Sequence, residues 1–138
     1  MRPVFSVFGL LLAACVTSTD PGSSNLVVQG AWDYTASQTS PTTATLTGKL
    51  TITAQSGGTY QGTASVVQND GGGTTDLTGA VAGQTVNDTT VDFDVFFDAN
   101  ARRHIATVVR DTMRGAWFET VGATTLSGTF LAVRRSGP

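Results

Sequence analysis

The chain has 138 residues, a formal net charge of −2, and charged side chains at only 13% of its positions. This length allows one folded domain, and the weak charge gives no support to nucleic-acid binding. A single cysteine excludes an intrachain disulfide bond and a cysteine-based metal site. Abundant threonine, 16 glycines and one lysine favour strands over long surface helices.

The N-terminal residues have the order of regions found in a signal peptide. Arg2 supplies the positive start, Pro3 to Ala14 form an apolar stretch, and small residues precede Cys15. The stretch is shorter than the roughly 20 residues that a membrane-spanning helix needs. We therefore expect a signal peptide over 1–14, and no membrane-crossing helix in the rest of the chain.

The four residues Leu12-Ala13-Ala14-Cys15 resemble the lipobox of bacterial lipoproteins. The resemblance implies cleavage before Cys15, a diacylglyceryl group on its sulfur and usually a further acyl chain such as palmitate on the new amino terminus. Two or three acyl chains anchor a protein stably in a membrane. An ordinary cleavable signal that contains a cysteine is the alternative. The resemblance places the protein in the cell envelope, and Val16 after the cysteine favours the outer membrane of a Gram-negative cell.

The segment after the cysteine is small, polar and interrupted by Pro21-Gly22, so 15–25 is expected to be the lipidated cysteine and a flexible tether. The folded domain is expected over 26–138. There, apolar and polar residues alternate between turn signals about every 12 residues. The pattern predicts eight strands, at 26–36, 44–55, 59–68, 75–82, 89–98, 102–110, 113–120 and 125–135.

The second and fifth predicted strands have the clearest faces. One face of the second strand is apolar and the other is mostly threonine, and the apolar face carries Leu46, Gly48, Leu50, Ile52 and Ala54. In the third strand Tyr60, Gly62, Ala64 and Val66 share a face, and in the fifth strand Val91, Phe93, Val95 and Phe97 do so.

The sixth strand is expected to pair with the fifth so that apolar side chains meet. A turn at 99–101 pairs Val95 with Ile105 and Val91 with Val109. The same register sets Asp98 opposite Arg102. It also turns His104 outward, beside Phe96.

Six strands contain glycine two positions before an apolar residue, at Gly30, Gly48, Gly62, Gly79, Gly115 and Gly128. Glycine weakens an ordinary strand, but it allows a sheet to bend sharply and close. We therefore predict an all-β fold, an eight-stranded antiparallel up-and-down meander barrel, with a β-sandwich as the alternative.

This pattern resembles the calycin barrels, which include the lipocalin-like and avidin-like proteins. Gly30-Ala31-Trp32 is similar to the opening of the first strand in those barrels, and Leu126 to Phe130 resemble closing strands of small bacterial barrel lipoproteins. The chain departs from lipocalins in its shorter length and in lacking their usual closing arginine pattern. It also lacks the polar residues with which avidins hold biotin. The resemblance implies an architecture and no particular ligand.

Catalytic and metal-binding patterns are weak. His104 is the single histidine, so a Ser-His-Asp triad would have to use it, and no nucleophile-elbow motif accompanies it. Asp92, Asp94 and Asp98 share a strand face, but residues two apart on a strand are about 7 Å apart and do not converge on one ion. We expect no metal, no cofactor and no catalytic residues. Arg102-Arg103 and Arg134-Arg135 are expected near the barrel rims.

Four aromatic residues are the candidates for ligand binding, namely Trp32, Tyr34, Tyr60 and Trp117. They either line a pocket at one end of the barrel or fill its core, and so short a chain favours the filled core. The leading hypothesis is a lipid-anchored, non-enzymatic envelope protein that binds a small apolar ligand or an envelope partner. The alternatives are a structural surface lipoprotein with a filled barrel and a cyclase or hydrolase on a barrel scaffold.

Overall fold

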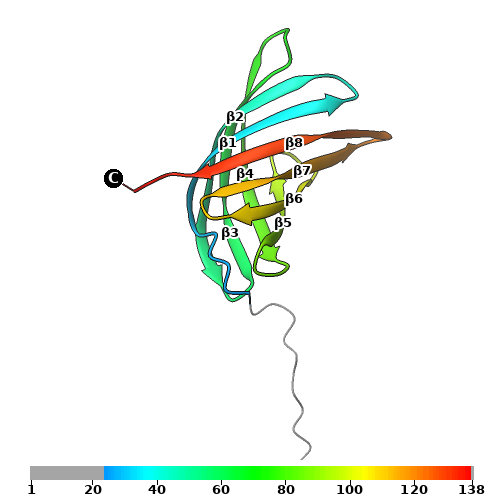
Figure 1. The fold of residues 1–138 in the computed structure, drawn as a ribbon. Coiled ribbons are helices and arrows are strands. Elements are labelled where there is room, and N and C mark those ends of the chain that lie inside the picture. Colours follow the sequence, from blue (N-terminus) through cyan, green and yellow to red (C-terminus); the bar gives the residue numbers. More distant parts are fainter. Residues whose placement is uncertain (1–23, 138) are drawn as a thin grey trace, which may run out of the picture.

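The computed structural model describes residues 24–137, and these form a closed barrel of eight antiparallel strands (Figure 1). Each strand pairs with the next along the chain, and the last pairs with the first. The strands are β1 Gly30–Ser40, β2 Ala44–Ser56, β3 Thr59–Asn69, β4 Thr74–Thr85, β5 Thr90–Phe96, β6 Arg102–Val109, β7 Thr112–Val121 and β8 Thr124–Arg134. The predicted meander barrel is confirmed, and the sandwich alternative is wrong. The predicted signal peptide, Cys15 and most of the predicted tether lie outside the described residues.

The first strand begins four residues later than predicted, at Gly30. Gly30 has a φ of +134°, which turns the chain between the preceding segment and β1. Two backbone amides that precede Gly30 bond to a side chain and not to a neighbouring strand. Val28 N and Gln29 N donate to Gln55 Oε1, at 2.9 and 3.2 Å. The amide Nε2 of Gln55 in turn donates to Leu26 O at 2.7 Å. The segment 26–29 is thereby held at the barrel end and is not part of the sheet.

Alternate residues of the strands face the interior, as the sequence predicted for β2, β3 and β5. Leu46, Leu50 and Ile52 are at most 2% exposed, and they lie on the apolar face of β2. Ala54 is exposed, which contradicts its predicted place on that face. The cause is a register shift between β2 and β3 that falls between Ile52 and Ala54.

Glycines in the middle of the strands let neighbouring strands approach closely. A Cβ on Gly62 would lie 2.0 Å from Thr51 O, and one on Gly128 would lie 1.8 Å from Ser37 O. Comparable contacts with backbone of the adjacent strand occur at Gly48, Gly79 and Gly115. No side chain fits at these points, so the sheet can curl tightly enough to close.

The barrel has two ends that differ in construction. We call the end where the described chain begins the proximal end, and the end formed by the β1–β2, β3–β4, β5–β6 and β7–β8 connections the distal end. In Figure 1 the β1–β2, β3–β4 and β7–β8 hairpins extend to the top and right, away from the blue N-terminal segment. The hydrophobic core runs along the interior between the two ends.

The register of β5 against β6 differs from the predicted one. Val95 pairs with Arg102, and Phe93 pairs with His104. Ile105 therefore faces outward, 43% exposed, while His104 faces inward and is fully buried. The predicted pairing of Asp98 with Arg102 and the outward position of His104 are both wrong. The prediction assumed that the apolar residues of β6 face inward, whereas this strand turns Arg102 and His104 to the interior, where each finds polar partners.

Candidate functional site

Trp32 and Arg134 close the proximal end. The indole Nε1 of Trp32 donates to Val28 O at 2.9 Å. Arg134 is the register partner of Trp32, and its guanidinium carbon lies 4.3 Å from the centre of the indole ring. Its Nη1 and Nη2 donate to Gln29 O and Val27 O, at 2.6 and 2.8 Å. Arg134, which was expected near a barrel rim, lies at the proximal end and covers the tryptophan of the first strand.

Arg102, Glu119 and Trp117 form a second buried cluster toward the distal end. Nε and Nη2 of Arg102 donate to Glu119 Oε2, at 3.0 and 2.8 Å, and both side chains are about 95% buried. The guanidinium carbon lies 4.4 Å from the centre of the Trp117 ring and 5.0 Å from that of Phe97. The carboxylate balances the charge of the guanidinium, so a buried ion pair is held beside two aromatic rings.

Two donors of this cluster are left open. Among residues 24–137, neither Arg102 Nη1 nor Trp117 Nε1 has a hydrogen-bond partner, and both atoms are buried. A buried donor without a partner costs about 1–3 kcal/mol. Tyr60 Oη and Asp94 Oδ1 are also unpartnered, but neither belongs to this cluster. The distal cluster therefore offers two hydrogen-bond donors at one place in the barrel.

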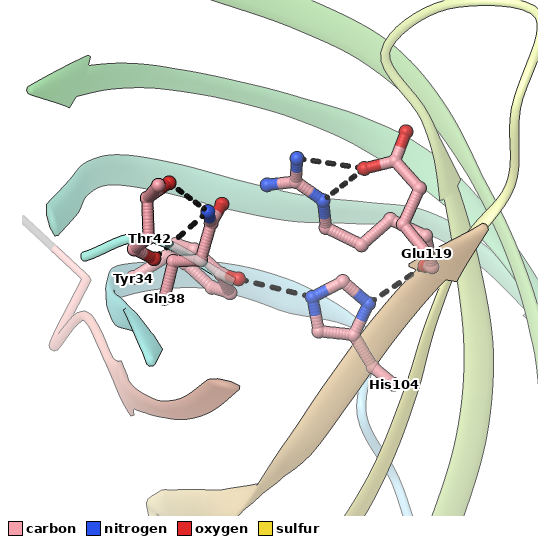
Figure 2. A network of polar contacts seen from close by, with 6 residues as sticks. Tyr34, Gln38, Thr42, His104 and Glu119 are labelled. Carbon is pink, nitrogen blue, oxygen red and sulfur yellow. Dashed lines mark hydrogen bonds and ion pairs between the residues drawn. The ribbon is translucent and has the colours of Figure 1, made fainter. Parts of the chain in front are cut away.

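A row of interior positions connects this cluster to the rim. Trp117 pairs with Gly128, and Gly128 pairs with Gln38. A Cβ on Gly128 would lie 2.9 Å from Trp117 Nε1, so the indole nitrogen lies over the glycine. Gln38 is held at the rim by hydrogen bonds from its Nε2 to Thr42 O and Thr42 Oγ1, at 3.0 and 3.2 Å (Figure 2). A surface groove of about 490 Å³ is lined by Gln38 and Ala44 together with residues of the β3–β4 connection.

The rest of the distal interior is apolar. Leu77, Phe97 and Leu126 are partly exposed and pack against the core from the distal side. Apolar side chains around a few polar groups are typical of sites that bind small molecules.

An aromatic layer separates the distal cluster from the proximal end. His104 stacks on Phe93, with ring centres 4.6 Å apart, and Phe130 meets the imidazole edge-on at 4.9 Å. Tyr34 stacks on Phe130 at 5.7 Å. These rings fill the middle of the barrel.

His104 is a satisfied interior residue. Its Nδ1 donates to Arg102 O at 2.9 Å, so Nε2 is the atom that accepts a hydrogen bond from the Tyr34 hydroxyl at 3.0 Å (Figure 2). Burial lowers the pKa of His104 to about 3, and burial raises the pKa of Tyr34 well above its usual value. The imidazole is therefore neutral at ordinary pH, and its single N–H is bonded to Arg102 O.

The four predicted ligand-binding residues are all interior, but the structure does not bring them together. Trp32 belongs to the proximal closure and Trp117 to the distal cluster. Tyr34 bonds to His104 in the aromatic layer. The ring centre of Tyr60 lies 6.4 Å from that of Phe93. Tyr60 is the second residue of β3, which begins at the proximal end. Of the four, Tyr60 and Trp117 have a buried polar atom without a partner among residues 24–137, and only Trp117 belongs to the distal cluster.

Arg102 and Glu119 are the residues that the sequence analysis missed. Arg102 was expected at a rim, and Glu119 was not singled out. They are direct partners across β6 and β7, and Phe118, next to Glu119, is 40% exposed on the outer face. The sequence signal that could have found Glu119 is its position two residues after Trp117. Alternate residues of a strand share a face, so an inward tryptophan predicts an inward carboxylate.

In the acidic run on β5, Asp92 forms an ion pair with Arg103. Arg103 Nε donates to Asp92 Oδ1 at 3.0 Å. Within residues 24–137, no group of three histidine, cysteine, aspartate or glutamate side chains is arranged to hold a metal ion. In the same part of the chain, no helix has the length and apolar character needed to cross a membrane.

Comparison with known proteins identifies the architecture. No family model matches the chain, and no curated protein matches it significantly. The structure is similar to that of EF1p2_mFAP2b bound to DFHBI, with a TM-score of 0.67 and 16% identity over 78% of this chain and 93% of the other. It is also similar to the redesigned β-barrel mFAP1 bound to DFHBI, with a TM-score of 0.58 and 18% identity over 78% of this chain and 94% of the other. At these identities the likeness shows the fold alone, an eight-stranded antiparallel meander barrel.

Proposed function

We propose that this chain is a lipoprotein of the cell envelope, anchored through lipid on Cys15, whose barrel binds a small, mostly apolar molecule at its distal end. The observation that carries the binding role is the difference between the two ends. Segment 26–29 and Arg134 close the proximal end, whereas the distal end combines a buried ion pair, partly exposed apolar side chains and an adjacent groove. Two barrels of similar fold are bound to DFHBI, which supports a binding role for such a scaffold.

The barrel acts without catalysis in this proposal. The contacts of His104 support this part, because both of its ring nitrogens are engaged, by Arg102 O and by the Tyr34 hydroxyl. A general base needs a free lone pair within reach of its substrate. The carboxylate of Glu119 is likewise engaged, through Oε2, with the guanidinium of Arg102.

The proposed anchor sets the orientation of the barrel. The described chain begins at the proximal end, where Asn25 N donates to Asp88 Oδ1 in the β4–β5 connection. Eight residues lie between Cys15 and Ser24, and the nine steps from one to the other span at most about 30 Å. The proximal end is then the end held nearest to the membrane, and the distal end faces away from it.

A partner protein in the envelope is the second candidate. The outer face of β5, β6 and β7 carries Phe96, Ile105 and Phe118, which are 41%, 43% and 40% exposed. Large apolar side chains on an outer face are typical of contact surfaces. The filled middle of the barrel also suits this role, because a solid scaffold presents its outer face without needing a cavity.

Native mass spectrometry of the full-length protein, purified from its host in mild detergent, tests the binding role. We expect a co-purified molecule of small mass that is lost from the double variant Arg102→Met/Glu119→Met and kept in Arg103→Met, which alters only the outer face. A defined complex with another protein and no small molecule in either sample would favour the second candidate.

Mass analysis of the same preparation tests the anchor. We expect a chain that begins at Cys15 and carries diacylglycerol, and loss of membrane association in the variant Cys15→Ser. An unmodified thiol at Cys15 would remove the lipoprotein assignment and leave the binding role to be judged separately.

A further inference from the structure

The hydrogen-bonding groups and the charge of the distal cluster define the class of ligand that it would bind. We propose that the distal end binds a neutral molecule through an acceptor oxygen, such as a carbonyl, that receives hydrogen bonds from Arg102 Nη1 and Trp117 Nε1. This inference rests on the proposed binding role, and it specifies which atoms of the barrel meet the ligand.

The geometry provides two donors at one place. The Arg102 guanidinium carbon lies 4.4 Å from the centre of the Trp117 ring, so Nη1 and the indole Nε1 are close neighbours. Arg102 is 4% exposed and Trp117 is 1% exposed. Neither atom has a partner among the described residues, and burial makes a partner valuable. A ligand oxygen that reaches both atoms would supply the missing partner of each.

The charge of the cluster selects a neutral ligand. Glu119 already neutralises Arg102 through a bond of 2.8 Å. A carboxylate ligand would add a second negative charge beside Glu119 in a site of low polarity, which is costly. A ligand with only donor groups would face Nη1 and Nε1 with no acceptor. A neutral acceptor oxygen avoids both penalties.

The neighbouring residues limit the rest of the ligand. Leu77 and Leu126 supply apolar walls, and the layer of Phe93, His104 and Phe130 closes the interior below the cluster. The indole nitrogen of Trp117 lies over Gly128, whose strand neighbour on the other side is Gln38. The ligand is therefore compact and apolar apart from its acceptor, and it enters from the distal rim.

Nuclear magnetic resonance of the ¹⁵N-labelled full-length protein in detergent tests this directly. The chain has two tryptophans, so the spectrum contains two indole N–H signals, which the variant Trp117→Phe assigns. Four probes with one aromatic ring differ only in polarity: acetophenone, ethylbenzene, benzoate and benzylammonium. The Trp32 signal is an internal reference, because its N–H is already bonded to Val28 O.

We expect acetophenone to shift the Trp117 signal and leave the Trp32 signal in place. Ethylbenzene, which lacks the acceptor, is expected to bind about ten-fold more weakly, the factor that corresponds to one good hydrogen bond. The double variant Arg102→Met/Glu119→Met removes Nη1 and leaves Trp117 Nε1, so its preference for acetophenone should fall below ten-fold. Arg103→Met, whose side chain lies on the outer face, should keep the ten-fold preference. Detergent takes up a given probe to the same extent in every sample, so the change of this ratio from one variant to another does not depend on it.

Other outcomes separate this inference from the proposed function. Equal binding of ethylbenzene and acetophenone, with shifted signals of Leu77 and Leu126, would overturn the role of the donors while the binding function stands. Tighter binding of benzoate would overturn the neutral class of ligand in the same way. If no probe moves any distal signal, both the inference and the binding function are overturned.

Discussion

Each end of the barrel holds a buried tryptophan beside an arginine, and both tryptophans come from the same tripeptide, Gly-Ala-Trp, in β1 and in β7. At the proximal end Trp32 and Arg134 donate to backbone carbonyls of residues 27–29. At the distal end Arg102 is occupied by Glu119 on one side only, and Trp117 Nε1 has no partner among the described residues.

The two ends differ in the hydrogen-bond acceptors that reach them from chain segments outside the sheet. The segment 26–29 crosses the proximal end and brings three carbonyl groups to the tryptophan and the arginine. Within residues 24–137, no corresponding segment crosses the distal end, where short connections join the strands. The tryptophan and arginine pair therefore closes the proximal end, where backbone carbonyls accept its hydrogen bonds. At the distal end, where no such carbonyls arrive, two of its donors have no partner among the described residues.

The largest effect is expected at the distal ion pair. Arg102→Met leaves the Glu119 carboxylate buried without its partner, and we expect a loss of about 4 kcal/mol in the free energy of unfolding. The double variant Arg102→Met/Glu119→Met should recover all but about 1 kcal/mol, since a buried ion pair can be replaced by apolar residues of similar volume. Urea denaturation followed by circular dichroism measures both. A double variant as unstable as the single one would show that the pair holds the barrel together.

At the proximal end, Arg134→Met removes the hydrogen bonds to Gln29 O and Val27 O. We expect the free energy of unfolding to fall by about 2 kcal/mol, because these are bonds from a charged donor. Arg135→Met is the control: Arg135 pairs with Asp33 on the surface, and a change within about 0.5 kcal/mol is expected there. Equal losses in the two variants would contradict a closing role for Arg134.

The aromatic layer between the ends should make stability depend on pH. Burial lowers the pKa of His104 from 6.5 to about 3, so the folded state resists protonation that the unfolded state accepts. Stability is full above pH 6.5 and falls as the pH drops toward 3, by up to about 1.4 kcal/mol per pH unit. Urea denaturation at pH 7, 6 and 5 measures the slope, and His104→Gln should flatten it. An equal slope in that variant would assign the pH dependence to carboxylates.

The smallest effect separates the two indoles directly. Trp32→Phe and Trp117→Phe leave similar cavities, but only the first breaks a hydrogen bond made within the protein. We expect Trp32→Phe to be about 1 kcal/mol more destabilising than Trp117→Phe. Thermal unfolding of both variants at one pH provides the comparison, and equal losses would mean that Trp117 Nε1 is satisfied in the free protein.

The fold could be predicted because most of its signals are local. Alternation in β2 and β5, turn residues between strands and glycines within strands each act over a few residues, and together they indicated a closed meander. The register of β5 and β6 could not be predicted, because it depends on long-range pairing. His104 is turned inward by contacts with Tyr34 and Phe93, which are distant in the chain or on the facing strand. The rule that apolar residues face inward fails on β6, where Ile105 is outside.

The distal cluster was predicted only in part for the same reason. Trp117 was a candidate from residue type alone. Arg102 and Glu119 belong to it through pairing across β6 and β7, and they are 17 residues apart in sequence. A buried ion pair is identified only once both side chains are known to share a face, and that required the correct parity of β6.

The position of Gln55 determines how the barrel responds to tension. Its side chain joins β2 to the backbone of residues 26–29 through three hydrogen bonds, and this junction comes before β1 along the chain. A pull on the N-terminus therefore loads the bond from Asn25 to Asp88, then these three bonds, the two from Arg134 and the one from Trp32, before it reaches the ladders of β1 with β2 and β8. Mechanical strain is taken up by side chains at the edge of the barrel and is kept out of the closed sheet.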